Sequence, residues 1–306
     1  MSERGGGVKR PCYLVDAFSD RPLAGNAAAV VLDAPELSTT ELQRVARELQ
    51  QAETAFPLPA REPQAAFHLR WFTPFTEVRF CGHATLAALH VLAVEAQRIR
   101  VPAQGVARLS FTCKAGLLRA ELSRPQGRLR AVFETPPTGF ARQTVDGALL
   151  AALNLVPEML DPDVPPQRAT AEEGNLYLCL RDKKALARVR GDPGALPALA
   201  SGLGVVGFVP FVRSPEAGVD VALRAIFADY GVAEDPVTGS ASGHLALLLQ
   251  QLSPAGLPRH LVFTQGDEVG RPGRIEIELR PGSDPTDLRA WITGPATIVL
   301  RGELDL

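Results

Sequence analysis

Apolar and polar residues alternate along several short stretches of the chain, which is the pattern of half-buried strands. In the first half the alternation predicts strands at residues 12–18, 28–32, 67–72, 107–113 and 117–122. In the second half it predicts strands at residues 129–133, which we take as the first strand of that half, and at 176–180, 205–212, 221–227, 261–263 and 274–279. The period changes after Ser38, where Glu41 completes a capping box and apolar residues recur at helical spacing. This amphipathic helix is predicted to end near residue 51, just before Glu53.

Two other predicted helices are apolar on nearly every side. The first follows Gly82 and continues through the apolar residues 85–92, and the second follows Gly239 and contains the apolar run 245–249. A helix of this kind must be enclosed by other elements. Predicted strands surround each one, whereas the crossover helix of an alternating strand–helix fold would be amphipathic. The pattern therefore predicts an α+β fold in which curled sheets enclose a central helix.

The two enclosed helices begin in similar ways, which indicates a repeat. Residues 80–85 read FCGHAT and residues 234–240 read EDPVTGS, while the upstream segments read LRWF at 69–72 and LRAIF at 223–227. We therefore expect two similar domains, residues 1–128 and 129–306, whose helix starts face one another across a shared cleft. The final strand is the segment that could return to the first domain. The length of 306 residues suits this division, since a domain takes roughly 150 residues.

Charge and cysteine content exclude several classes of function. The chain carries 32 basic and 34 acidic residues without a basic cluster, so we expect no binding to nucleic acid or to a membrane surface. The four cysteines are far apart and form no Cys-x-x-Cys pair, which indicates reduced thiols and gives zinc or iron–sulfur ligation little support. Residues 1–10 contain no apolar signal segment, and no apolar stretch of about 18 residues occurs. We therefore expect a cytoplasmic protein.

Gly82 and Gly239 stand where the backbone N–H groups of a helix are left without partners. These groups lie at the positive end of the helix dipole, and glycine lets an anion approach them closely. Each glycine could instead serve only tight packing or a positive φ. Because two such turns occur, each beside an ionisable residue, we favour a site for a small carboxylate or phosphate.

Four ionisable residues near these turns are candidates for proton transfer. Glu53 has apolar neighbours in the sequence, and loss of water would raise its pKa toward the range useful for an acid or base, although an ordinary solvated glutamate is the alternative. Asp235 precedes a proline that extends its backbone, but a turn aspartate would look the same. His83 could act as an acid, as a base or as a hydrogen-bond donor to an anion. Its alternative role is only a hydrogen bond at the helix entry. Cys81 could be activated, since a helix N-terminus lowers a thiol pKa, or could be a small buried apolar residue.

The absence of several known catalytic motifs excludes further classes of enzyme. No nucleophile elbow, Walker loop, dinucleotide fingerprint or His-Glu-x-x-His motif occurs. Instead, the chain resembles the phenazine-biosynthesis PhzF-like isomerase family, which is related to diaminopimelate epimerase and proline racemase. The resemblance rests on residues 15–32 (VDAFSDRPLAGNAAAVVL), 52–56 (AETAF), 70–92 (RWFTPFTEVRFCGHATLAALHVL), 234–241 (EDPVTGSA) and a late loop at 265–272. The combination of CGHAT and EDPVTGSA is highly specific.

The resemblance implies a fold and a site. The fold would be α+β and diaminopimelate epimerase-like, with two pseudo-symmetric β-barrel-like domains, each around a central apolar helix, and the site between them. The activity would be proton transfer on a small carboxylate-bearing substrate, without a cofactor or metal and usually in a homodimer. Glu53 would be the acid/base residue, assisted by His83, Asp235 and Ser240. The substrate-binding residues would be Asn26, Gly82, His83, Gly239 and Ser240.

The chain also departs from the family pattern. The epimerase and racemase branches use one cysteine from each half as a pair of bases, whereas here Cys81 has no cysteine counterpart and Asp235-Pro236 occupies the second position. Asn26 is followed by alanine where many relatives have proline. Two alternatives to a PhzF-like isomerase therefore stay open. One is an epimerase or racemase that uses Cys81 with a non-thiol partner, and the other is a catalytically silent protein that binds a small anion.

Overall fold

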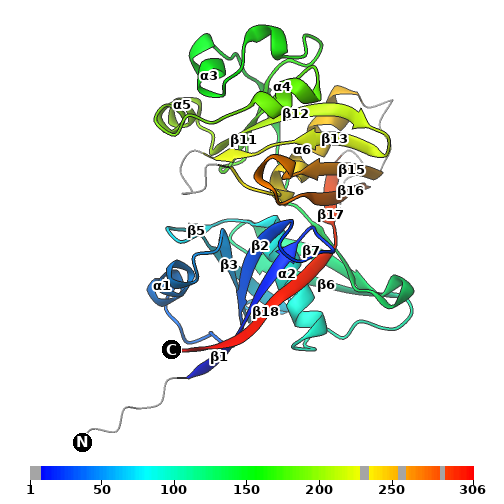
Figure 1. Cartoon of the computed structure of the whole chain (residues 1–306). Helices are drawn as coiled ribbons and strands as arrows, with labels where there is room; N and C mark the ends of the chain where they lie inside the picture. The colour runs from blue at the N-terminus through cyan, green and yellow to red at the C-terminus, as the bar shows by residue number, and fades with distance from the viewer. Residues whose placement is uncertain (1–7, 228–233, 254–259, 283–286) are drawn as a thin grey trace, which may run out of the picture.

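Strands outnumber helices in the computed structural model, which describes residues 8–227, 234–253, 260–282 and 287–306. Figure 1 shows two lobes, one above the other, each with strands around a helix. This arrangement confirms the α+β class. Residues 1–7, which belong to the N-terminal segment searched for a signal, lie outside the described residues. Among the described residues, no helix is long and apolar enough to cross a membrane.

The lower lobe in Figure 1 contains the first eight strands and the last one. The strands are β1 (Lys9–Ala17), β2 (Asn26–Val31), β3 (Glu53–Pro59), β4 (Phe67–Phe72), β5 (Glu77–Val78), β6 (Val106–Cys113), β7 (Gly116–Ser123), β8 (Arg130–Glu134) and β18 (Ala296–Asp305). The helices are α1 (Thr39–Leu49), α2 (Gly82–Val94) and the 3₁₀ helix η1 (Pro125–Gly127). β18 pairs antiparallel with β1, so the end of the chain returns to the lobe in which it began. The domain limits at residue 128 stay a prediction.

The upper lobe contains the remaining elements. Its strands are β9 (Phe140–Arg142), β10 (Gln167–Ala169), β11 (Asn175–Cys179), β12 (Gly207–Glu216), β13 (Val219–Leu223), β14 (Ile226–Phe227), β15 (His260–Gln265), β16 (Gly273–Pro281) and β17 (Leu288–Thr293). Its helices are α3 (Gly147–Ala152), α4 (Lys183–Arg188), α5 (Leu196–Leu203), α6 (Gly239–Leu252) and the 3₁₀ helices η2 (Pro157–Met159) and η3 (Asp267–Val269). Helices α3, α4 and α5, which the hydrophobic pattern did not predict, lie on the outside of this lobe in Figure 1.

The strands of the two halves pair in the same order. β2 and β3 are parallel, β3 and β4 antiparallel, β4 and β6 parallel, and β6–β7 and β7–β8 antiparallel. In the second half, β11 and β12 are parallel, β12 and β13 antiparallel, β13 and β15 parallel, and β15–β16 and β16–β17 antiparallel. In each half the enclosed helix comes after the third of these strands and one short strand: α2 follows β4 and β5, and α6 follows β13 and β14. These pairings confirm the predicted repeat, and β8 pairs with β17 to join the two sets.

Glu53 lies at the start of β3, a strand that the hydrophobic pattern did not predict. Pro57 and Pro59 count against a strand in the sequence, because proline cannot donate to the ladder. The structure accommodates them because β2 pairs with β3 only as far as Ala55. Beyond that residue one edge of β3 has no β2 partner, so a missing N–H there breaks no bond to β2. Glu53 is consequently held by a strand pairing and is not a free residue after a helix.

The strand predicted at residues 221–227 is interrupted, which corrects the sequence expectation. β13 ends at Leu223 and β14 begins at Ile226. Both pair with β12, and the interruption lies opposite Pro210 of that strand. Because proline has no N–H, the ladder there retains only the bond from the Arg224 N–H to the Pro210 carbonyl, at 3.0 Å. The proline in the partner strand therefore divides one predicted strand into two.

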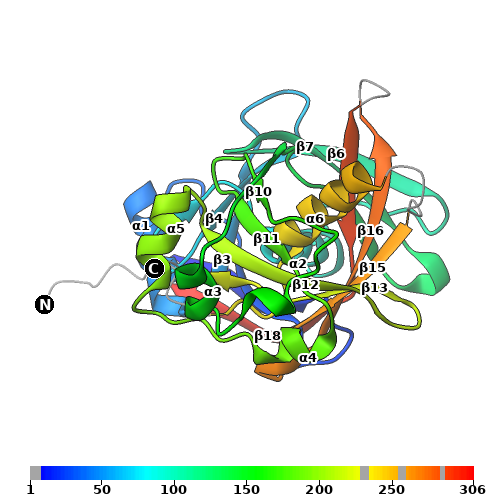
Figure 2. The same ribbon diagram turned by 90° about the horizontal axis from the view of Figure 1, so that it is seen from above.

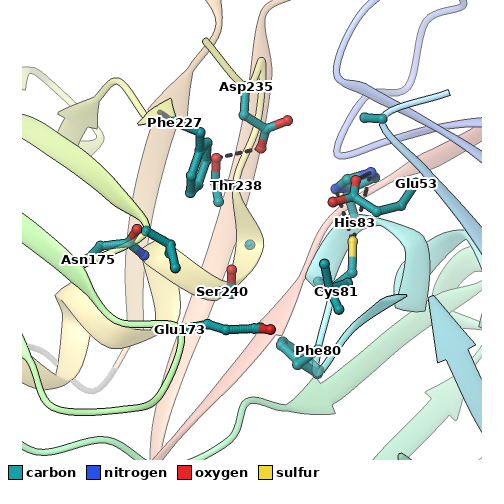
Figure 3. Close-up of a pocket in the computed structure, with 15 residues that line it drawn as sticks. Glu53, Phe80, Cys81, His83, Glu173, Asn175, Phe227, Asp235, Thr238 and Ser240 are labelled. Carbon is teal, nitrogen blue, oxygen red and sulfur yellow. Dashed lines mark hydrogen bonds and ion pairs between the residues drawn. The ribbon is translucent and has the colours of Figure 1, made fainter. Parts of the chain in front are cut away.

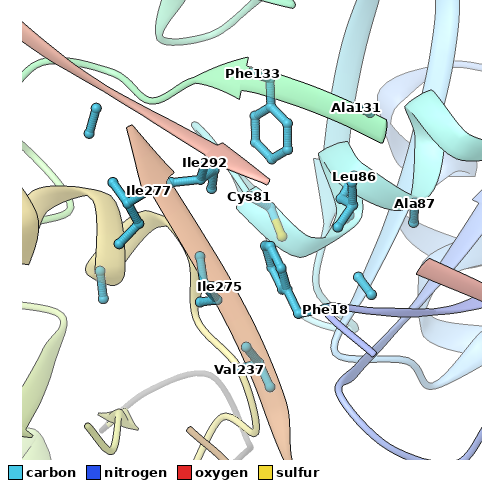
Figure 4. Packing of buried hydrophobic residues seen from close by; sticks show 14 of the residues in the cluster. Phe18, Cys81, Leu86, Ala87, Ala131, Phe133, Val237, Ile275, Ile277 and Ile292 are labelled. Atoms are coloured by element: carbon cyan, nitrogen blue, oxygen red, sulfur yellow. The ribbon is translucent and has the colours of Figure 1, made fainter. Parts of the chain in front are cut away.

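The two apolar helices lie near the centre of the molecule, as Figure 2 shows from above. Every residue of α2 from Gly82 to Leu89 is buried, which confirms that this helix is enclosed. Its first turn packs against side chains from both lobes, among them Phe18, Phe133, Ile275 and Ile292 (Figure 4). Burying one such side chain contributes roughly 1.5–3 kcal/mol. A single apolar core therefore runs through the contact between the two helix starts.

The starts of α2 and α6 touch, and only glycine permits this distance. A Cβ atom added to Gly82 would lie 3.0 Å from the Cα of Gly239 and 3.1 Å from the backbone nitrogen of Ser240. On the other side, a Cβ added to Gly239 would lie 2.8 Å from Cδ1 of Ile292. The contact confirms that the two helix starts face one another. It also explains both glycines by close backbone approach, since neither has a positive φ.

The close contact predicts a selective loss of stability. Gly82→Ala forces a methyl group against backbone atoms that cannot move aside, so we expect destabilisation by roughly 1–3 kcal/mol. Gly202→Ala in α5 is the matched control, because its added Cβ would meet no atom within 4 Å. That substitution is expected to stabilise the protein by up to about 1 kcal/mol. Urea denaturation of both variants measures the difference, and equal stability of Gly82→Ala and wild type would contradict the observed packing.

Candidate active site

The two helix starts form one wall of a pocket to which both halves of the chain contribute (Figure 3). The pocket brings together all but one of the residues proposed from the sequence. Its lining consists of Ala52, Glu53, Val78, Phe80, Cys81, Gly82, His83, Glu173, Asn175, Val206, Phe227, Asp235, Thr238, Gly239 and Ser240. The remaining candidate, Asn26, lies directly behind this wall and contacts two of its members.

Neither of the helices at the pocket is capped by a side chain. α1, α3 and α4 begin with Ser38, Asp146 and Asp182, and each of these side chains accepts a hydrogen bond from the first turn. α2 begins after Cys81 and α6 after Thr238, and neither of these side chains makes a capping bond. The first N–H groups of α2 and α6 therefore have no side-chain acceptor, at the positive end of each helix. This arrangement can bind a carboxylate or another small anion.

Glu53 and His83 form an ion pair at the side of the pocket. The Glu53 Oε2 and His83 Nε2 atoms are 3.1 Å apart, and the Glu53 side chain is 19% exposed. This Oε2 atom is buried and has no partner with hydrogen-bond geometry. The pairing of β3 with β2 places Glu53 beside Ala28, one strand away from Asn26. The Glu53 carboxylate is therefore fixed in place but retains an oxygen that a substrate could contact.

Asn26 links His83 to the second half of the chain. Its Nδ2 atom lies 3.0 Å from Nδ1 of His83, 2.7 Å from Oδ1 of Asp235 and 3.0 Å from the carbonyl oxygen of Val237. An amide nitrogen carries two hydrogens, so these three acceptors share them. When His83 is neutral and its Nδ1 accepts from Asn26, the ring proton resides on Nε2 and points toward Glu53. The amide nitrogen of Asn26 is thus used by protein groups and not by a substrate.

The charges around His83 and Cys81 affect their protonation in opposite ways. Burial alone would lower the pKa of His83, but the acidic groups of Cys81 and Glu53 raise that pKa well above its ordinary value. Burial, together with the Glu53 carboxylate, raises the pKa of the Cys81 thiol to about 11. Cys81 therefore carries its proton at neutral pH, and the Glu53 carboxylate is then the negative group that raises the pKa of His83. Of the two interpretations of Cys81 that the sequence left open, this direction favours a small buried residue over an activated thiol.

Asp235 faces these groups from the second half. Thr238 donates from Oγ1 to its carboxylate at 2.6 Å, and Asn26 donates to the other oxygen. Removal from water raises the pKa of Asp235 to about 6, against the opposing effect of the charge on His83. Gln265 holds the segment by donating to the Asp235 carbonyl and accepting from the Thr238 N–H. The carboxyl can therefore change its charge near neutral pH.

Sequence reasoning missed several residues of the pocket wall. Glu173 lies opposite the helix starts, where both carboxylate oxygens accept from the Arg79 N–H at 3.2 and 3.3 Å, and burial raises its pKa. Phe80 adds apolar surface beside Glu173, and Phe227 adds apolar surface beside Thr238 (Figure 3). Glu173 belongs to a loop without a recognisable motif, so no local signal could have identified it. Phe80 stands directly before Cys81 and Phe227 ends the repeated LRAIF segment, so the motifs offered an indication for these two residues.

Comparison with known proteins identifies the family and the fold of the chain. The profile of the family described as phenazine biosynthesis-like protein (PhzC-PhzF) matches residues 15–302. The chain is 32% identical over 303 residues to the Escherichia coli protein named uncharacterized isomerase YddE, covering 97% of this chain and 98% of that protein. A PhzF-family protein of Bacillus anthracis has a similar structure, with a TM-score of 0.84 at 24% identity and coverage of 97% and 99%. A probable proline racemase of Agrobacterium radiobacter shares the fold at a TM-score of 0.67 and 15% identity, covering 97% and 93%.

The raised pKa of Asp235 predicts how stability depends on pH. A carboxyl whose pKa is higher in the folded protein contributes stability that is complete below its unfolded pKa, near 4, and is lost as the pH rises through about 6. At about 1.4 kcal/mol per unit of pKa, the loss is roughly 1–3 kcal/mol. Asp235→Asn removes this contribution, so the unfolding free energy of wild type minus that of the variant should fall by this amount between pH 4 and 7.

Chemical denaturation at several pH values measures this difference. Asp305→Asn, on the exposed surface of β18, is the control and should show no such trend. A wild-type-minus-Asp235→Asn difference that stays constant from pH 4 to 7 would contradict the assigned direction of the shift.

Proposed function

The chain belongs to the phenazine biosynthesis-like family, and from this premise we propose that it is a cofactor-independent isomerase. The proposed reaction moves a proton on a small carboxylate-bearing substrate bound between the two lobes. One observation carries the proposal: the Glu53 carboxylate, paired with His83 at 3.1 Å, lines the same pocket as two uncapped helix starts. A base and an anion site in one pocket are what such a reaction requires.

The substrate carboxylate would bind at the starts of α2 and α6. The N–H groups of Gly82 and His83 come from one helix and those of Gly239 and Ser240 from the other, and the Ser240 side chain lines the pocket as well. Two helix dipoles would then act on one negative charge. This placement holds the substrate without help from Glu53, which stays available for chemistry.

Glu53 would remove a proton from a substrate carbon and return it to a second carbon. The electron pair left by the C–H bond moves toward the bound carboxylate or an adjacent double bond, and a new C–H bond forms where the proton is delivered. His83, which carries a raised pKa, would hold the Glu53 carboxylate in place and offset the negative charge that develops. Asp235 would act on His83 through Asn26. No electrons leave the substrate, so the step needs no redox partner.

A reaction in which Cys81 acts as a base is the second candidate. Its Sγ atom lies 3.5 Å from Nδ1 of His83, which is the observation in its favour. The raised pKa of the thiol argues against it, because a protonated cysteine cannot accept a proton. A homodimer, a cytoplasmic location and the absence of nucleic-acid or membrane partners stay predictions.

Glu53→Gln is expected to lose proton transfer and to retain binding. General acid/base catalysis contributes about 10²–10⁴-fold, so kcat should fall by roughly 100-fold or more. A panel of amino and hydroxy acids is incubated with the protein in D₂O, and mass spectrometry records deuterium at carbon. Binding of the reactive compound to Glu53→Gln is then measured by calorimetry.

Three outcomes of this experiment have different meanings. Loss of exchange with retained binding supports Glu53 as the base. Exchange at the wild-type rate in Glu53→Gln contradicts that role. Binding without exchange in the wild-type protein would favour a catalytically silent anion-binding protein.

Cys81→Ser is expected to keep its activity. Because the thiol stays protonated at neutral pH, its removal should change the exchange rate by less than about tenfold, or roughly 1.4 kcal/mol in barrier height. Cys113→Ser, a buried cysteine of β6 away from the pocket, controls for general effects of the replacement. Complete loss of exchange in a folded Cys81→Ser protein would instead favour the cysteine-dependent epimerase or racemase.

A further inference from the structure

We propose that Glu53, Cys81 and His83 form a binding site for one Zn²⁺ ion, which competes with the substrate for the pocket. The three residues each place one ligand atom within 4.8 Å of the others. The proposal concerns an inhibitory ion and not a resident cofactor. Its effect on activity rests on the proposed function, whereas the binding itself does not.

The three ligand atoms are close enough for one tetrahedral ion, and the Cys81 sulfur is the ligand that has to move. The His83 Nε2 atom lies 3.1 Å from Glu53 Oε2 and 3.9 Å from Cys81 Sγ. Zinc bonds of about 2.0–2.3 Å at tetrahedral angles place neighbouring ligand atoms roughly 3.4–3.6 Å apart. The nitrogen–oxygen spacing therefore needs to change by only about 0.3 Å, whereas Cys81 Sγ, which lies 3.5 Å from Nδ1 of the same ring, has to turn toward the Nε2 side to reach the ion. Figure 3 shows the three side chains turned toward one another on the same side of the pocket.

The types of donor also favour zinc over harder cations. A thiolate, an imidazole and a carboxylate together suit Zn²⁺ or Co²⁺, whereas Mg²⁺ and Ca²⁺ prefer oxygen ligands alone. The Glu53 Oε2 atom is buried and its contact with His83 at 3.1 Å lacks hydrogen-bond geometry, so coordination would give this atom a well-directed partner. A water molecule could complete the fourth position from the exposed side of Glu53. The described lining of the pocket contains no Lys or Arg, and the carboxyl groups of Glu53, Glu173 and Asp235 in that lining offset the partial positive charge of the two helix starts.

The surroundings of His83 can support coordination. A ligating histidine normally uses its second ring nitrogen in another hydrogen bond, and Nδ1 of His83 already contacts Asn26. When Nε2 binds the ion, the ring keeps one proton on Nδ1. The Asn26 amide would then turn its oxygen toward that proton, a rotation that exchanges two atoms of nearly the same size. As the ion binds, the Cys81 thiol releases its proton to solvent, and a protonated His83 releases the proton on Nε2 as well.

Cobalt provides the direct test, because Co²⁺ replaces Zn²⁺ and reports its ligands by absorption. Titration of the full-length protein with Co²⁺ should give one bound ion per chain, a thiolate-to-cobalt charge-transfer band and the intense visible bands of four-coordinate cobalt. Added Zn²⁺ should remove these bands. Cys81→Ser should abolish the charge-transfer band and weaken binding at least tenfold, while Cys113→Ser should match wild type.

Glu53→Gln guards against a folding failure of the cysteine variant. It should keep the charge-transfer band and bind Co²⁺ at least tenfold more weakly, since the thiolate and imidazole remain. A charge-transfer band that persists in Cys81→Ser, or wild-type protein that binds no Co²⁺, overturns the proposal. In the exchange assay Zn²⁺ should raise the apparent KM of the reactive substrate. Zinc binding without such competition would overturn the inhibitory role but leave the assignment of Glu53 as base unaffected.

Discussion

Two helix ends of like partial charge meet at Gly82 and Gly239, and much of the molecule is arranged around that contact. Each helix start carries the equivalent of about half a positive charge, so apposing two of them is unfavourable unless something negative lies between or beside them. No side chain caps either helix. Glu53 and Asp235 instead lie on the lining of the same pocket. A bound carboxylate would supply further negative charge where the two starts meet.

The same contact explains why both halves repeat one pattern of strand pairing. A buried helix that is apolar on all sides needs strands around it, and the strands around α2 pair in the same order as those around α6. Two such units bring their helix starts together only if they are joined firmly. β8 and β17 pair across the junction. Arg271 adds a second connection from the far side, since it pairs with Asp16 at 2.7 Å and donates to the carbonyl oxygens of Ala24 and Gly25.

Much of the fold could be predicted because its signals are local. The capping box of Ser38 and Glu41 formed as expected, and the apolar run after Gly82 became an enclosed helix. The failures arose where a partner strand decides the outcome. Pro57 is tolerated in β3 because β2 ends its pairing earlier, and Pro210 of β12 interrupts the strand that follows β12 in the chain. Such effects depend on pairing, which alternation alone does not reveal.

The candidate site also contains some residues that the sequence could identify and others that it could not. Residues within the repeated motifs could be proposed from the sequence, and the structure brings them to one pocket. Glu173 comes from a loop without a motif and reaches the pocket only through the fold. The protonation of Cys81 also needed the structure, because burial raises its pKa whereas its place before a helix predicts the opposite. A rule about local position fails when loss of water has the larger effect.

The central claim is that the starts of α2 and α6 hold a substrate carboxylate together. Backbone ¹⁵N chemical shifts test it most directly, with small carboxylic acids titrated into the labelled protein and their methyl esters as uncharged controls. The account predicts saturable shifts at Gly82, His83, Gly239 and Ser240 with one common affinity for the acids, and none for the esters. Shifts confined to one of the two helix starts, or equal shifts with acids and esters, would contradict it.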